Sequence, residues 1–120
     1  MIDKEMASAE YDLKMAEESI LKSDTKWASV QAYYSMFHSA KALVFTKGYR
    51  EKSHYCLIVA LRELYIKTKE LEKDIGDNLE NCMDIRHGAD YGLTYDKESA
   101  KICIEAARNL FESAKLILNK

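Results

Sequence analysis

The sequence contains no proline and only four glycines in 120 residues. All-β domains and doubly wound α/β domains of this length normally use more of both residue types in their turns, so this scarcity argues against both classes. Four dispersed glycines also exclude the glycine-rich loops GxxxxGK[ST] and GxGxxG, which hold nucleotide phosphates. The composition therefore favours helices joined by short connections.

Cysteines are few and widely spaced, at Cys56, Cys82 and Cys103. No CxxC pair and no HExxH pattern occurs, so we expect neither a metal site nor a disulfide scaffold. We expect each thiol to pack as a small buried apolar group in a reducing compartment. There is no run of about 18 apolar residues and no apolar segment behind the charged N-terminus, which predicts a cytoplasmic protein without a membrane contact.

Basic charge is not in excess, because 18 lysines and arginines face 20 aspartates and glutamates, for a net charge of −2. A stand-alone nucleic-acid-binding domain usually shows a basic excess, although a local basic cleft stays possible. With 48% hydrophobic residues, the chain can bury a core of its own. We therefore expect a single domain over residues 1–120.

Apolar residues recur at helical spacing through most of the chain. The pattern predicts five helices, over residues 3–22, 26–47, 53–71, 72–90 and 97–118, with a loop at 91–96. Asp24 and Ser53 stand where N-caps belong, and Gly48 stands where a helix would end. The predicted fold is all-α, an antiparallel up-and-down bundle of four long helices plus a fifth.

The helix expected at 26–47 is apolar over much of its circumference, which predicts a central position in the bundle. Its aromatic residues are most simply core, and the alternative is that one face closes a homodimer; they are Trp27, Tyr33, Tyr34 and Phe37. A modest basic cluster follows in the next connection. It indicates a solvated loop, or the rim of an RNA groove if it lies beside Arg86; its members are Lys41, Lys47, Arg50 and Lys52.

The fourth predicted helix carries a charge on the face that should be apolar. Ile75, Leu79 and Cys82 predict the next inward position at residue 86, which is Arg86. Asp90 follows at i+4 on the same face, so the two side chains can pair. The pair is either a structural ion pair at the end of the bundle or a site where a phosphate competes for the guanidinium.

The three histidines are the other residues that could transfer a proton near neutral pH. His87 points roughly 100° away from Arg86 on the same helix. His38 lies within the central helix and His54 at the start of the third. The alternatives are a satisfied core or interface residue for His38 and a surface residue for His54.

Four stretches together resemble the HEPN family (higher eukaryotes and prokaryotes nucleotide-binding). They are AYYSMFHSAKAL at 32–43, KGYR at 47–50, Ser53-His54, and RHGADYG at 86–92. The resemblance covers nearly the whole chain and implies a five-helix bundle. The ADYG ending is similar to a small archaeal and bacterial branch of the family.

The resemblance implies a protein without cofactors that acts on RNA as a homodimer. Many family members are metal-independent ribonuclease toxins with an R-x4–6-H motif, encoded beside a minimal nucleotidyltransferase. Arg86 matches the motif arginine, and Tyr91 stands at the first position where the motif histidine could occur. By this resemblance the catalytic candidates are Arg86, Asp90 and Tyr91. The candidates for nucleotide or RNA contacts are His87, His54, Tyr33 and Arg50.

Two functions follow from these features. The first is a toxin-like endoribonuclease, in which Arg86 stabilises the scissile phosphate and Tyr91, His87 or His54 replaces the motif histidine. The second is a non-catalytic module, a homodimer that binds nucleotides or presents the substrate of a separately encoded minimal nucleotidyltransferase.

Overall fold

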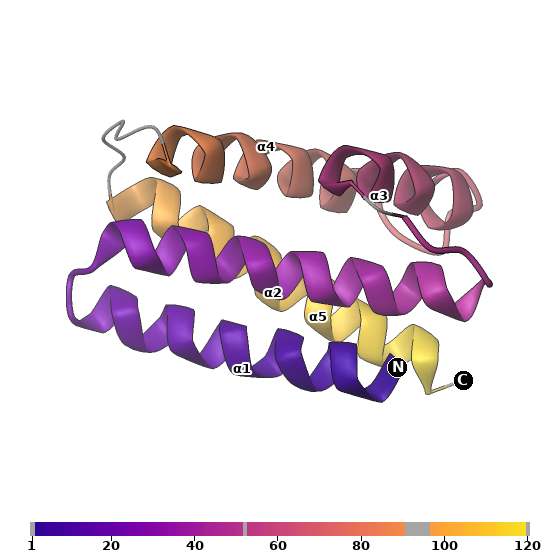
Figure 1. The fold of residues 1–120 in the computed structure, drawn as a ribbon, viewed down its shortest axis with the longest axis horizontal. Helices are drawn as coiled ribbons and strands as arrows, with labels where there is room; N and C mark the ends of the chain where they lie inside the picture. The colour runs from indigo at the N-terminus through magenta and orange to yellow at the C-terminus, as the bar shows by residue number, and fades with distance from the viewer. Residues whose placement is uncertain (1, 52, 91–96, 120) are drawn as a thin grey trace.

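The computed structural model describes residues 2–51, 53–90 and 97–119, with the side chains of 87–90 outside the description (Figure 1). Within these ranges the chain forms helices and no strand. The elements are α1 (Ile2–Leu21), α2 (Thr25–Thr46), α3 (His54–Leu61), the π-helical turn η1 (Arg62–Ile66), α4 (Lys73–Asp90) and α5 (Lys97–Leu118). The predicted all-α bundle of four long helices and a fifth is confirmed.

Helix α2 is the centre of the bundle, because it packs against α1, α3, α4 and α5. In Figure 1 it lies between α1 on one side and α3 and α4 on the other, with α5 behind it. Small side chains let its neighbours approach closely, and Ala28, Ala32 and Ala40 are fully buried. The Ser35 hydroxyl donates to the Ala9 carbonyl at 2.8 Å and ties α2 to α1.

Helix ends follow the predicted capping residues. The Asp24 carboxylate accepts from the Trp27 backbone N–H at 3.2 Å, and the Ser53 hydroxyl accepts from the Cys56 N–H at 3.0 Å. Gly48 follows α2 with φ +86°, a left-handed conformation that costs glycine little. These caps fix where α2 and α3 begin and where α2 ends.

The third helix is shorter than the predicted span of 53–71. It ends in η1 at Ile66, and Lys69 then takes a left-handed φ of +66°. The chain can turn there because the Tyr65 carbonyl accepts from the N–H groups of both Glu70 and Leu71. The apolar spacing continues past the helix because Leu71 is buried in the turn rather than on a helix face.

Two side chains lie outside the core that the sequence predicts for them. Trp27 is 52% exposed, because the first turn of α2 directs it toward the outer groove between α1 and α2. Cys56 is exposed in the first turn of α3, whereas Cys82 and Cys103 are buried as expected. Among the described residues, no helix is long and apolar enough to cross a bilayer.

Candidate functional site

Arg86 lies on α4 against two aromatic rings of α2. Its guanidinium carbon is 5.8 Å from the Tyr33 ring centre and 5.4 Å from that of Tyr34. The side chain is half-buried, so it keeps access to solvent. A planar guanidinium that lies on aromatic faces can bind an anion through the N–H groups in its own plane.

His54 reaches the same rings from the start of α3. Its Nδ1 is 2.6 Å from the Tyr33 hydroxyl, and its ring stacks on Phe37 with centres 4.3 Å apart. The Ser53 cap places His54 at the first position of α3, beside α2. We call Tyr33, Tyr34, Phe37, His54 and Arg86 the Arg86 cluster.

The electrostatics of the cluster keep Tyr33 neutral. Burial raises the pKa of Tyr33 well above its usual value, and the nearby Arg86 cation offsets only part of this rise. The Tyr33 side chain is 1% exposed. A neutral hydroxyl can donate to Nδ1 or accept from it, so Tyr33 holds the imidazole in either protonation state.

The other predicted contacts lie elsewhere or outside the described side chains. Arg50 lies beyond the end of α2, and its guanidinium is 5.7 Å from the Phe45 ring centre. Phe45 itself lies about two helical turns after Phe37 on α2. The α4 backbone includes His87 and Asp90, whose side chains are not described, and Tyr91 is outside the described residues. The structure therefore brings together Arg86, Tyr33 and His54 from the predicted set.

His38 has a structural position between α2 and α1. Its Nδ1 is 2.7 Å from a Glu5 carboxylate oxygen, and its Nε2 is 3.6 Å from Asp12. Lys41 pairs with the same Glu5 at 3.3 Å. These contacts agree with the interpretation of His38 as a satisfied interface histidine.

Two of the predicted basic residues, Lys41 and Arg50, lie over the same Phe45 ring, at 5.6 and 5.7 Å from its centre, whereas Lys47 has other partners. Lys41 faces α1, whereas Lys47 pairs with Glu70 at 2.9 Å and lies 4.6 Å from the Tyr65 ring centre. Lys52 is outside the described residues. Within the described part of the chain, no three His, Cys, Asp or Glu side chains are grouped to hold a metal ion.

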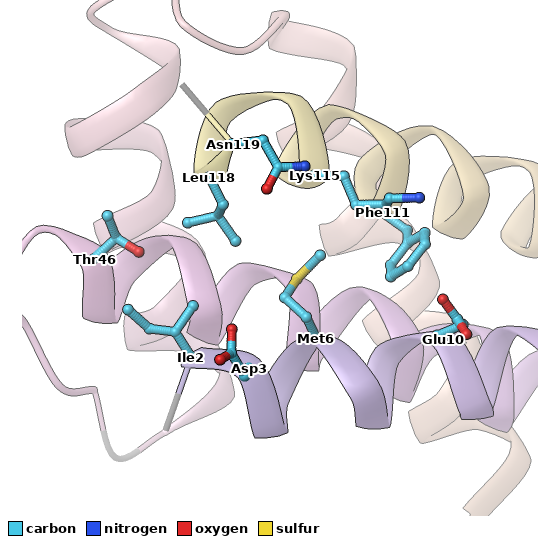
Figure 2. Close-up of a pocket in the computed structure, with 9 residues that line it drawn as sticks. All are labelled: Ile2, Asp3, Met6, Glu10, Thr46, Phe111, Lys115, Leu118 and Asn119. Carbon is cyan, nitrogen blue, oxygen red and sulfur yellow. The ribbon is translucent and has the colours of Figure 1, made fainter.

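A separate cavity of about 690 Å³ lies where α1 begins and α5 ends (Figure 2). Met6, Phe111 and Leu118 give it apolar walls, and Glu10 and Lys115 bring charges of opposite sign. Among the described residues, its walls include none of the predicted site residues and one cation, Lys115, against the carboxylates of Asp3 and Glu10. We therefore do not assign it to the binding of a polyanion.

Sequence reasoning placed Tyr34 and Phe37 in the core and missed their part in the cluster. Tyr33 and Phe37 are one helical turn apart on α2, and that spacing is the signal that they share a face. The bond between Tyr33 and His54 joins residues 21 positions apart across a loop. No local pattern encodes such a contact.

The Arg86 cluster can bind an anion and transfer a proton. Arginine binds a phosphate with two parallel N–H donors, and imidazole exchanges protons near neutral pH. Both groups lie against the rings of Tyr33 and Tyr34. Together they suit a phosphodiester better than a neutral substrate.

Sequence comparison finds relatives of this chain among known proteins. A protein of Methanocaldococcus jannaschii named "putative toxin" is 29% identical over 119 residues, which cover 99% of this chain and 78% of the relative. A second protein of that organism with the same kind of name is 30% identical, over 78% of this chain and 65% of the relative. An Archaeoglobus fulgidus protein, named only as a member of UPF0332, is 32% identical over 74% of this chain and 72% of its own length. The profile of the HEPN domain matches residues 4–117, and the chain belongs to the HEPN domain family.

Proposed function

We propose that this chain is a toxin-like endoribonuclease that acts on RNA at the Arg86 cluster. One observation carries the proposal: the Arg86 guanidinium rests on the Tyr33 and Tyr34 rings, and His54 is bonded to the same Tyr33. The toxin names of two relatives support the biological role. The chain offers a phosphate-binding group and a proton-transfer group on neighbouring helices.

His54 is our candidate for the proton transfer. Cleavage requires that the RNA 2′-hydroxyl lose its proton as its oxygen attacks phosphorus, and that the departing 5′-oxygen gain one as its bond to phosphorus breaks. Arg86 stabilises the negative charge that develops on the phosphate oxygens. His54 serves one of the two proton transfers, and Tyr33 keeps its ring in position. His87, Asp90 and Tyr91 stay candidates for the remaining roles.

We also propose that the active form is a homodimer and that the chain works with a separately encoded minimal nucleotidyltransferase. The family resemblance is the reason for proposing both the second copy of the chain and the nucleotidyltransferase. Co-expression with a nucleotidyltransferase from the neighbouring reading frame, followed by co-purification, tests the second partner. Sedimentation of the purified chain at several concentrations tests the first.

The decisive experiment measures RNA cleavage by the purified chain in EDTA. We expect the wild type to cut single-stranded RNA. In Arg86→Ala the rate of cleavage should fall by about 10²-fold. Arg108→Ala is the matched control, because Arg108 lies on α5 and pairs with Glu17 and Glu105 instead. Equal cleavage by wild type and Arg86→Ala, or none by either, would overturn the nuclease proposal.

The second candidate function is a non-catalytic, nucleotide-binding or substrate-presenting module. It is favoured by Tyr91, which stands where the family's motif histidine could first occur. Tyrosine is a weak proton carrier at pH 7, since its reference pKa is about 10. RNA binding that depends on Arg86 without any cleavage, in a chain that co-purifies with the nucleotidyltransferase, would establish this function instead.

A further inference from the structure

A groove of about 360 Å³ lies on the outer side of α1 and α2, close to the Arg86 cluster. We call it the Trp27 groove; it is lined by Tyr11, Asp12, Met15, Trp27, Val30, Gln31 and Tyr34. Trp27 is 52% exposed and Tyr11 is 63% exposed. Two large aromatic side chains on one open groove are typical of a binding surface rather than of a core.

Trp27 is held in its exposed position. With the Gln31 amide turned to satisfy its neighbours, the Gln31 oxygen accepts from the indole N–H at 3.0 Å, and the Gln31 nitrogen donates to the Met15 carbonyl at 3.1 Å. The backbone N–H of Trp27 also donates to the Asp24 cap. An aromatic ring fixed before binding loses little conformational freedom when a flat ligand stacks on it.

Tyr34 connects this groove to the guanidinium. The Tyr34 side chain lines the Trp27 groove and also lies 5.4 Å from the Arg86 guanidinium carbon. Figure 1 shows the corresponding arrangement of helices, with α2 between α1 and α4. A ligand that crosses Tyr34 would meet aromatic rings on the α1 side and a cation on the α4 side.

We propose that the Trp27 groove is a base-binding subsite, which takes an unstacked base of single-stranded RNA whose phosphate lies on Arg86. A nucleotide has a flat ring beside an anion, which matches the rings of the groove and the nearby guanidinium. The subsite rests on the proposed RNA function and deepens it, because it names the part of the substrate that the chain grips beside the scissile phosphate.

The polar groups of the groove favour a base over an apolar helix of a second copy. The Asp12 carboxylate lies on the wall and can accept from the exocyclic amino group of adenine, guanine or cytosine. Burial raises the pKa of Asp12, and His38 beside it lowers it in part. An apolar helix would take the Asp12–His38 pair out of water without adding a partner to it, and that desolvation opposes its binding.

Trp27 is the only tryptophan of the chain, so its fluorescence reports directly on the groove. We expect adenosine 5′-monophosphate and a short oligoadenylate to quench the emission saturably. Adenosine, which lacks the phosphate, should bind more weakly than adenosine 5′-monophosphate in the wild type. In Arg86→Ala this difference should disappear, because the phosphate has lost its partner.

Tyr11→Ala tests the groove with little risk to folding, since the Tyr11 side chain is mostly exposed. We expect about tenfold weaker binding of oligoadenylate, as one stacking contact is lost. Tyr55→Ala is the matched control, because Tyr55 is also 63% exposed but lies on α3, outside the groove. It should bind as the wild type does.

The outcomes separate the subsite from the nuclease proposal. Quenching without cleavage supports the subsite while the nuclease proposal fails. Cleavage without quenching, or equal binding by Tyr11→Ala and the wild type, overturns the subsite and leaves the nuclease proposal standing. Emission that changes with protein concentration but not with nucleotide shows that a second copy covers the groove, and this also overturns the subsite.

Discussion

At the scale of single residues, the Tyr33 hydroxyl determines how His54 is held. His54 is held by the 2.6 Å contact of its Nδ1 with the Tyr33 hydroxyl and by the stack of its ring on Phe37. Because the pKa of Tyr33 is raised by burial, its hydroxyl keeps its proton across the physiological range. When the hydroxyl donates to Nδ1, the neutral imidazole carries its own proton on Nε2.

Tyr33→Phe removes this hydroxyl and keeps the ring. We expect the free energy of unfolding to fall by about 1 kcal/mol, the usual net value of one hydrogen bond. If His54 transfers a proton, RNA cleavage should fall by about tenfold as well, because the imidazole is less well oriented. Chemical denaturation and a cleavage assay measure the two effects.

Tyr65→Phe is the control for Tyr33→Phe. The Tyr65 hydroxyl is also buried and donates to the Leu43 carbonyl at 2.6 Å, but Tyr65 is not part of the Arg86 cluster. A similar loss of stability with unchanged cleavage is expected. If both variants reduced cleavage equally, the role of Tyr33 would be structural only.

Tyr65 also predicts how stability depends on alkaline pH. Burial, with a smaller contribution from Glu70, raises the pKa of Tyr65 from 10.0 to about 12. Above pH 10 the unfolded chain releases this proton while the folded chain retains it, so stability falls as pH rises through this window. The full effect is about 3 kcal/mol. Urea unfolding between pH 9 and 12 should show a flatter profile for Tyr65→Phe, and identical slopes for both proteins would contradict the assignment.

Residue spacing predicted part of the site and could not predict the rest. The spacing of Ile75, Leu79 and Cys82 predicts that Arg86 faces inward. In the structure Arg86 lies between α4 and α2, against the Tyr33 ring. It could not predict that Trp27 lies outward, since the first turn of a helix is only partly covered by its neighbours. Nor could it predict that His54 meets Tyr33, because the loop between α2 and α3 sets that contact.

At the scale of elements, the start of α3 matters most for the site, because it positions His54. The predicted helices at 3–22, 26–47 and 97–118 agree closely with α1, α2 and α5, because each carries a long uninterrupted stripe. The predicted third helix was too long. Leu71 keeps the apolar spacing of that helix, but it lies in the turn that follows η1. Its beginning was predicted well, because Ser53 provides a local cap signal.

Ser53→Ala tests the N-cap of α3. Loss of the hydroxyl that accepts from the Cys56 N–H should lower the free energy of unfolding by about 1 kcal/mol. Because His54 is the first residue of α3, fraying of this turn should also weaken its contact with Tyr33. We expect broader imidazole signals for His54 in NMR spectra, and Ser53→Thr should restore them. Sharp, unshifted signals in Ser53→Ala would show that the Tyr33 contact holds His54 without the cap.

At the scale of the whole molecule, the chain has no excess of basic charge. The net charge is −2, and several cations on the bundle surface lie against carboxylates. These are Lys41 with Glu5, Lys47 with Glu70, Arg62 with Asp77 and Glu80, and Arg108 with Glu17 and Glu105. With no net basic charge to attract a long polyanion, we expect the proposed recognition of RNA to depend on a few contacts.

The salt dependence of RNA binding tests this distribution of charge. Each phosphate neutralised on single-stranded RNA contributes about −0.7 to the slope of log K against log salt concentration. With Arg86 as the main phosphate contact of each chain, we expect a shallow slope of about −0.7 to −1.4 per chain. Arg86→Ala should make the slope shallower by about 0.7, whereas Arg108→Ala should leave it unchanged. An unchanged slope in Arg86→Ala would place the phosphate contact elsewhere, and Arg50→Ala then identifies whether the end of α2 provides it. A steep slope in the wild type would instead mean that RNA displaces the surface carboxylates from their lysines and arginines.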